Sequence, residues 1–430
     1  MSGSDVPFGF TPGGSGDGQG GFDANALGEA LQQLGRMMQS GGAPGDGPVN
    51  WTMAKDAARQ LAAQSGDPSV PPSSRSAVQD AVQLAQTWLD PVVVFPVSDA
   101  TALAWSKSEW IEATIPSWQR LVEPIAVHMQ GMVDAQLPGS GELELPEELK
   151  AMFGGELPPE MASMLAPMMG MMKQLGAMTF AMQFGQGLGT LSNEVLGAAD
   201  IGIPLTADGR CALLPENVRA FGEGLELPAS EVLLYAAMRE AAHQRLFAHV
   251  PWLRARLEGA VEEYARGIKV DPERLNSAMR EIDMENPQSL QEALASGVFE
   301  PQDTPEQVAA LTRLETLLAL IEGWVDNVVA MAVVDRLPSA DALREAMRRR
   351  RGAGGPAEKT FANLVGLELR PRKLREAATL WGMLVSEGGI EQRDALWAHP
   401  DLLPTSDDLD DPVAFLERSK PLDLGELEDL

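Results

Sequence analysis

The 430-residue chain has one cysteine and few basic residues. Because Cys211 has no second cysteine to pair with, an internal disulfide is excluded, which is typical of a protein from a reducing compartment. Lys and Arg total 33 against 62 Asp and Glu, which gives a formal net charge of −29. This balance disfavours binding to nucleic acid or to an anionic membrane, since both attract positive surfaces. We expect a cytoplasmic protein that binds neither.

The chain also lacks the motifs of several other classes. Its first residues contain no basic region followed by an apolar run, so a signal peptide is not expected. No Gly-x-Ser-x-Gly is present, no motif links Cys211 to a histidine, and no glycine-rich phosphate motif follows a clear strand. The sequence therefore gives no support to serine, cysteine or nucleotide-dependent chemistry.

Uninterrupted apolar runs of membrane-spanning length are lacking as well. Residues 161–189 come nearest and hold eight of the 21 methionines, but Pro167, Lys173, Gln174 and several glycines interrupt them. Because methionine is flexible and fills irregular spaces, the segment could form a groove for varied peptides or a buried helical hairpin. We favour the buried hairpin.

What the sequence does contain is mostly helical patterning. Residues 1–49 are predicted to be a disordered, Gly-rich tail with a short helix at 25–40. Residues 50–404 are predicted to form one helical domain, and residues 405–430 an acidic tail. We expect a loop at 137–160, and further helices at 52–65, 73–89, from Asp99 with Ser98 as its cap, from Ser117 to about 135, and from Thr304 to about 336.

Two local patterns predict how the second half is organised. Thr304-Pro305-Glu306-Gln307 has the spacing of a capping box, with proline at the first helical position. A later helix ends in four arginines at 348–351, which suit the negative end of a helix dipole. The acidic, loose tail from Asp401 is expected either to contact the basic segments 344–351 and 370–375 or to remain solvated.

Only a small β element is expected. Residues 201–215 alternate apolar and turn residues around Asp208-Gly209, a strong hairpin signal, although an ordinary loop is an alternative. This segment directly precedes the helix that carries the most informative motif.

That helix is predicted at 229–249, with Ser230 as its cap and Pro251 beyond its end. Its middle reads Arg239-Glu240-Ala241-Ala242-His243. Residues four apart lie on one helix face, and His-Glu-x-x-His uses that spacing to hold zinc while the Glu activates a water. Arg239 stands where the first histidine would be, and a protonated guanidinium cannot ligate a metal.

Four strings carry a wider resemblance. They are MREAAHQRLFAHVPWL (238–253), LLALIEGWVDNVV (317–329), GGPAEKTFANLVGLELRPRKLREA (354–377) and DALWAHPDLLPTSDDLDDP (394–412). Together they resemble an actinobacterial family of hydrolases, the zincin-like metallopeptidase type 2 family, over roughly residues 50–412. Other branches of that family have an intact His-Glu-x-x-His at this place.

The resemblance implies a mostly α, zincin-like helical domain with at most a small β element before the motif helix. It implies zinc as cofactor, peptide-bond hydrolysis as reaction class, and a peptide or protein as substrate or partner. In that scheme Glu240 is the general base, while His243 and Glu322 are metal ligands. Two protein ligands make a weak zinc site, since catalytic zinc has three.

The residues leave two functions open. If Arg239 forms an ion pair with Glu322, and with Glu240 as a further option, the protein is a catalytically inactive zincin-like binding or interaction module. If another ligand completes the site, it is a metallopeptidase-like hydrolase. The sequence does not decide whether metal is bound, whether the protein is an enzyme, or in which oligomeric state it exists.

Overall fold

The computed structural model of the chain describes residues 47–97, 101–136, 159–206, 210–268, 304–352 and 372–419. The chain divides into two units, Met1–Pro44 and Gly45–Leu430, and all described residues belong to the second. The helix expected at 25–40 and residues 137–158 of the loop expected at 137–160 lie outside the described residues, whereas residues 159 and 160 are helical.

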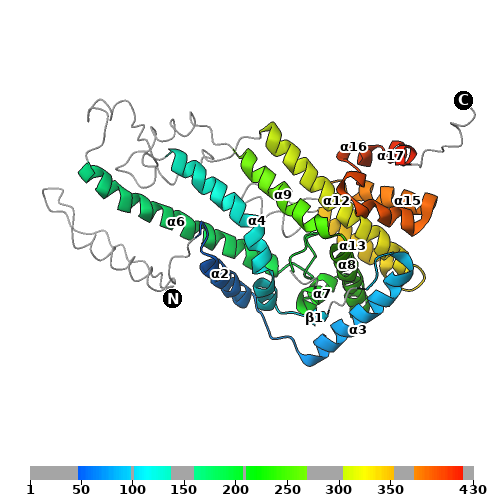
Figure 1. The fold of residues 1–430 in the computed structure, drawn as a ribbon. Helices are drawn as coiled ribbons and strands as arrows, with labels where there is room; N and C mark the ends of the chain where they lie inside the picture. The colour runs from blue at the N-terminus through cyan, green and yellow to red at the C-terminus, as the bar shows by residue number, and fades with distance from the viewer. Residues whose placement is uncertain are drawn as a thin grey trace, which may run out of the picture. The chain divides into compact units, whose positions relative to one another are not determined.

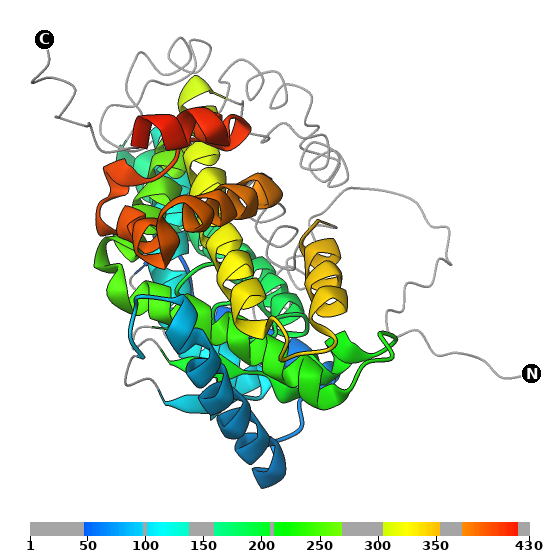
Figure 2. The same cartoon turned by 90° about the vertical axis from the view of Figure 1, so that its right-hand side faces the viewer.

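The described residues are mostly α-helical, as the sequence predicts (Figures 1 and 2). The helices are α2 Trp51–Gln64, α3 Pro72–Leu89, α4 Lys107–Gln136, α6 Pro159–Ser192, α7 Pro215–Gly222, α8 Ala229–His249, α9 Pro251–Gly267, α12 Pro305–Val333, α13 Ala340–Gly352, α15 Leu374–Ala395, α16 Ser406–Asp410 and α17 Pro412–Ser419. The two strands are β1 Ala102–Ala104 and β2 Cys211–Leu213.

The small sheet is built from distant segments. β2 pairs in parallel with β1, with Ala102 opposite Cys211, and Gly197 forms an antiparallel bridge to Leu213 on the other side. The expected local hairpin at 201–215 is therefore wrong for β2, and residues 207–209 lie outside the described part. Parallel pairing brings together segments that no short turn connects, so local turn signals cannot predict it.

The expected start of α4 and the expected cap of α8 are also wrong, although α8 spans Ala229–His249 as predicted. α4 begins at Lys107. The backbone N–H of Ser106 donates to Glu109 Oε2 at 2.7 Å, and the backbone N–H of Glu109 donates to Ser106 Oγ at 3.2 Å. Ser117 therefore lies inside the helix and is not its cap. α8 begins at Ala229 after Pro228, without a side-chain cap, so Ser230 lies in its first turn.

α6 is a single helix of 34 residues, so the predicted hairpin at 161–189 is wrong. Its C-terminal half packs on α2. A Cβ at Gly185 would overlap the carbonyl oxygen of Ala54, and one at Gly189 would lie 2.9 Å from that of Ala58. These glycines let the two helices approach closely; they do not break α6.

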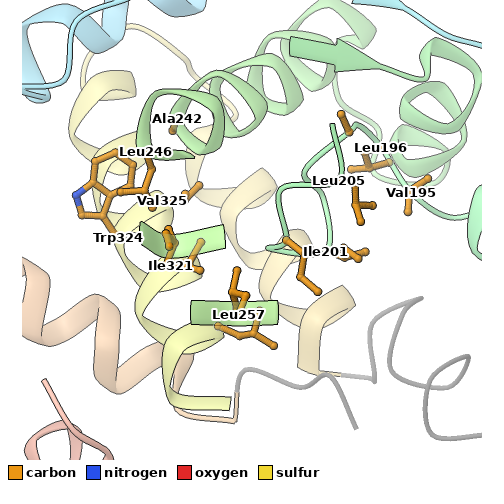
Figure 3. Close-up of a cluster of buried hydrophobic side chains, with 14 of the residues drawn as sticks. Val195, Leu196, Ile201, Leu205, Ala242, Leu246, Leu257, Ile321, Trp324 and Val325 are labelled. Atoms are coloured by element: carbon orange, nitrogen blue, oxygen red, sulfur yellow. The ribbon is translucent and has the colours of Figure 1, made fainter. Parts of the chain in front are cut away.

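α12 is the central helix of the core and packs against α9, α15 and α8 (Figures 1 and 3). Its predicted capping box is present, because Thr304 Oγ1 accepts from Gln307 N and Gln307 Oε1 accepts from Thr304 N. Among the described helices, α12 alone is long and apolar enough to cross a membrane by composition, but 78% of its apolar window is buried in the protein. Ile321, Trp324 and Val325 face Leu246 of α8 in the core shown in Figure 3.

The C-terminal part is ordered further than the sequence predicts. Thr405 caps α16, and Lys373 Nζ donates to Asp410 Oδ2 at 2.6 Å. The expectation of a loose chain after Asp401 is therefore wrong up to Ser419, although acidic Asp410 does contact the basic segment 370–375. Residues 420–430 lie outside the described part.

Candidate functional site

The motif residues lie where α8 is enclosed on all sides. Every residue of α8 from Leu234 to Leu246 is buried, which explains why the helix lacks a simple polar face. Arg239, Glu240 and His243 are 5%, 3% and 1% exposed, and Glu322 of α12 is fully buried. Buried charges and polar groups are tolerated only when they are paired, so their partners define what this site can do.

Glu322 is held by three donors. Arg239 Nη2 lies 2.6 Å from Glu322 Oε2, while His243 Nε2 and Arg351 Nη2 each lie 3.0 Å from Glu322 Oε1. Burial raises the pKa of Glu322, but Arg351, His243 and Arg239 outweigh it and lower the pKa to about 2. Glu322 is therefore ionised and uses both oxygens as acceptors.

His243 faces two acceptors. Its Nδ1 lies 2.9 Å from the carbonyl oxygen of Arg239, and its Nε2 faces the ionised Glu322. A neutral imidazole has only one N–H, so both hydrogen bonds form together only when both ring nitrogens carry a proton. Both ring nitrogens are thus engaged with oxygen atoms of the protein, whereas a metal ligand must offer a free nitrogen lone pair.

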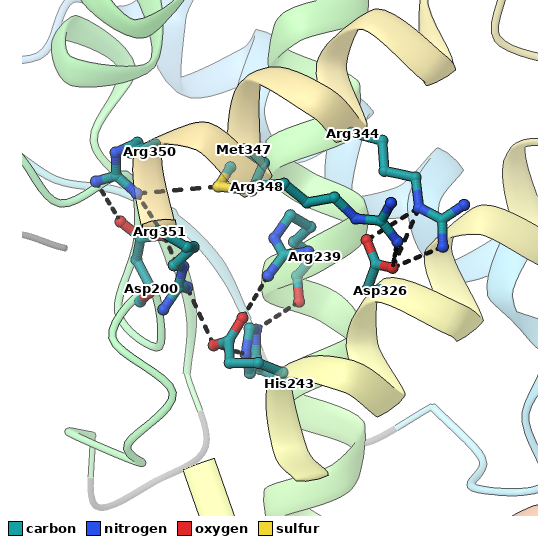
Figure 4. Close-up of polar contacts among 10 residues, drawn as sticks. Asp200, Arg239, His243, Asp326, Arg344, Met347, Arg348, Arg350 and Arg351 are labelled. Carbon is teal, nitrogen blue, oxygen red and sulfur yellow. Dashed lines mark hydrogen bonds and ion pairs between the residues drawn. The ribbon is translucent and has the colours of Figure 1, made fainter. Parts of the chain in front are cut away.

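Helix α13 adds arginines that the sequence interpretation missed (Figure 4). Arg350 Nη2 lies 2.8 Å from Asp200 Oδ2, and Arg351 donates to the backbone oxygen of Asp200 as well as pairing with Glu322. Burial raises the pKa of Asp200, yet Arg350 and Arg351 together move it well below its usual range. The arginine run marks this helix in the sequence, but no local signal identifies Asp200 as a partner 150 residues away.

Two further arginines of α13, Arg344 and Arg348, pair with Asp326 of α12. Arg344 and Arg348 lie 2.6 and 2.8 Å from Asp326 Oδ2. Three arginines lie in the last turn of α13, as the sequence predicts, and the structure adds a more specific role. Arg344, Arg348, Arg350 and Arg351 fasten α13 to carboxylates of the core.

Glu240 points away from this cluster. Its Oε2 accepts from Ala199 N at 3.0 Å, and its Oε1 accepts from Gln244 Nε2 at 3.0 Å. A Cβ at Gly197 would lie only 2.6 Å from Glu240 Oε2, so the loop before β2 needs a glycine there. Burial raises the pKa of Glu240 to about 7, although the bonds from Ala199 and Gln244 oppose this. The carboxylate anchors a loop, and the optional ion pair with Arg239 is not formed.

The space around the motif is closed. A cavity of about 10 Å³ is lined by residues that include Arg239, Glu240, His243 and Met347 of α13. Such a volume holds about one water molecule. A peptide therefore does not reach Glu240 in this conformation.

The fold and the motif match one family of known proteins. The model of the zincin-like metallopeptidase family matches residues 49–416. The chain belongs to this family. The match includes α16 and reaches into α17, which the sequence interpretation assigns to the acidic tail.

One solved structure shares the fold of this zincin-like chain. It is a protein from Chloroflexus aurantiacus, described as "a putative hydrolase with a novel fold", with a TM-score of 0.58 and 21% sequence identity. The likeness covers 86% of this chain and 98% of that chain. At this identity it shows the fold alone. A comparison with the curated proteins gives no match.

Family membership supports a hydrolase-type ancestry and implies zinc, but the residues of this zincin-like chain do not fit that metal. Catalytic zinc needs three protein ligands and an open position. Arg239 replaces one ligand with a cation, and the other two, His243 and Glu322, are bonded to each other and to Arg239. Among the described residues, no three His, Cys, Asp or Glu side chains are placed to hold a metal ion.

The remaining histidines do not complete the set. His128 Nε2 contacts the backbone oxygen of Ile268, His249 stacks on Phe95, and His399 accepts from its neighbour Asp401. Each is engaged away from His243. The structure therefore brings together Arg239, His243 and Glu322 as the sequence predicts, but as an ion-pair cluster.

Proposed function

We propose that this protein is a zincin-like binding module that has exchanged zinc-dependent peptide hydrolysis for recognition of a peptide or protein. The observation that carries the proposal is the 2.6 Å ion pair between Arg239 Nη2 and Glu322 Oε2. It places a permanent cation beside the carboxylate that would be the third metal ligand. Glu240 supports the same conclusion, because a general base must reach a substrate-side water and this carboxylate is bonded to Ala199 and Gln244.

A separate groove supports binding as the retained function. It has a volume of about 350 Å³ and lies between α9, α12 and the segment before α16. Trp252 and Leu317 are among its apolar lining residues, Arg256 contributes a positive charge, and Arg313 pairs with Glu263 within the lining. Ligand pockets are commonly of this size and combine an apolar lining with few polar groups.

The catalytic half of the proposal is tested by metal analysis of the full-length protein purified without added metal. We expect far less than one zinc per chain and no chelator-sensitive hydrolysis of an unstructured protein such as casein. His243→Ala is the matched variant. One zinc per wild-type chain that disappears in His243→Ala, together with chelator-sensitive hydrolysis, would show that the protein is a zinc enzyme.

The binding half is tested on a peptide array. We expect a subset of peptides to bind the wild type and to lose most of their signal with Arg256→Ala, which alters the groove. Arg75→Ala removes an exposed arginine from α3, outside the groove lining, and should bind as the wild type does. If the array shows no peptide that distinguishes these two variants, the groove is not the binding site.

A further inference from the structure

One carboxylate in the protein is recognised as completely as a bound ligand would be. Glu322 is fully buried: Arg239 donates to Oε2, His243 Nε2 faces Oε1, and Arg351 forms an ion pair with Oε1. Arg239 and His243 come from α8, and Arg351 comes from the end of α13. Charge-assisted bonds of this kind are the strongest hydrogen bonds that proteins use for carboxylates.

The loop that contains Gly202 places no side chain beside the Glu322 carboxylate at that position. Gly202 has φ +78°, and a Cβ there would lie 3.0 Å from Glu322 Oε1. Two separate restrictions, the positive φ and the near contact, thus require glycine next to the carboxylate. The loop approaches Glu322 with bare backbone, while Arg351 also binds the oxygen of Asp200 in the same loop.

Charge in this cluster is not balanced within the site. Arg239, Arg350 and Arg351 are three cations, and they pair with two anions, Glu322 and Asp200. Removal of the Glu322 carboxylate would leave Arg239 and Arg351 buried without this acceptor. Buried unpaired charges are costly, so the vacated place should favour any small anion that fits.

We propose that the metal position of this family has become a carboxylate receptor, built from Arg239, His243 and Arg351, with Glu322 as its built-in ligand. When the Glu322 side chain is shortened, the receptor takes a small monocarboxylate such as acetate. The inference uses the same residues as the proposed function, but it concerns what the cluster recognises, whether or not the groove binds a peptide.

The test is chemical rescue of Glu322→Ala. Acetate should raise the melting temperature of this variant by about 2 °C at ten times its dissociation constant. Acetamide has the same shape without the charge and should have no effect. Leu314→Ala removes a buried side chain two turns earlier on α12 and serves as the cavity control, which acetate should not stabilise.

A second variant identifies the donors. Glu322→Ala/Arg351→Met removes one guanidinium and should weaken acetate binding about tenfold or more, measured by calorimetry. If Glu322→Ala does not fold in buffer, acetate but not acetamide should restore folded protein on refolding. Equal effects of acetate and acetamide, or no effect on either stability or refolding, overturn the proposal. A peptide array that does not distinguish Arg256→Ala from Arg75→Ala would overturn the binding half of the proposed function and leave these results unchanged, so the two failures are distinguishable.

Discussion

Arg239 is the residue at which this chain departs from the zinc site that the family resemblance implies. Arg239 lies one helical turn before His243, and its guanidinium reaches the carboxylate of Glu322. His243 Nε2 and Glu322 Oε1 are already 3.0 Å apart. The two ligands that the family resemblance implies are thus adjacent, and Arg239 stands at the position of the third.

Arg239→His should therefore create zinc affinity. The substitution supplies a third ligand beside His243 and Glu322 and removes a cation that repels Zn²⁺. We expect affinity at least about a hundredfold above that of the wild type, measured by calorimetry at neutral pH. Because Arg351 still competes for Glu322, Arg239→His/Arg351→Met should bind zinc more tightly than the single variant.

Arg239→His/His243→Ala is the control for this prediction and should bind no better than the wild type. A folded Arg239→His variant that gives no binding heat with zinc would mean that Glu322 cannot turn toward the metal. The zincin-like geometry would then have been lost together with the histidine.

At the residue scale, the sequence predicts what lies within one helix. Arg239, Glu240 and His243 share α8, so their spacing alone places them together. Glu322 was found through resemblance to a family pattern. The pairing of Asp200 with Arg351 is not predictable, because it joins segments about 150 residues apart and Asp200 belongs to no motif. The direction of Glu240 also depends on a loop whose path only the fold determines.

At the scale of elements, close helix packing rests on glycine. α6 carries Gly185 against the Ala54 carbonyl of α2, where even a methyl group would overlap. Gly176 of the same helix is exposed, and a Cβ there would meet no atom within 4 Å. The two glycines therefore differ in packing and share the same helix.

Gly185→Ala should destabilise the protein, and Gly176→Ala should not. The first forces α6 away from α2, which costs about 1–3 kcal/mol as overpacking. The second exchanges glycine for a better helix former and should stabilise by up to about 1 kcal/mol. Urea unfolding followed by circular dichroism measures both. Equal effects of the two substitutions would contradict the close packing of α2 and α6.

Elements with strong local signals were predicted well, and elements defined by distant contacts were not. α2, α3 and α12 have helical periodicity, and α12 also has its own capping box. β1 has three residues and exists because β2 pairs with it across more than a hundred residues of chain. In α6, Gly185 and Gly189 look like helix breakers in the sequence, but in the structure they are the points where α6 contacts α2. Packing against α2 outweighs the low helix propensity of glycine.

At the scale of the whole molecule, two buried glutamates give stability opposite dependences on pH. The pKa of Glu322 is lowered from 4.5 to about 2, so its contribution is present above pH 4.5 and is lost as the pH falls toward 2. Burial raises the pKa of Glu240 from 4.5 to about 7. Between these values the unfolded chain releases a proton that the folded chain keeps, so stability falls as the pH rises. Together the two groups favour maximum stability near pH 5.

Glu240→Gln should remove the decline on the neutral side. Its amide is neutral at every pH, and the amide of Gln244 can turn to match it. Relative to the wild type, the free energy of unfolding of the variant should increase between pH 5 and pH 8, by on the order of 3 kcal/mol. Urea unfolding at a series of pH values measures this. Glu387 is exposed, so Glu387→Gln is the control and should show the same fall in the free energy of unfolding with pH as the wild type. A similar fall in Glu240→Gln would show that Glu240 does not cause it.

The tryptophans of the C-terminal half have an optical consequence. Trp397 stacks on Trp381, 5.5 Å away at 20°, and on Trp252, 6.3 Å away at 28°, so three indoles form one stacked group. Rings at such separations share their electronic excitations, and their transition dipoles couple. The near-ultraviolet circular dichroism should therefore carry an exciton signal from this triplet, stronger than isolated tryptophans would give. Because α9, α15 and the segment after α15 supply one ring each, that signal would report whether these three parts of the chain are docked together.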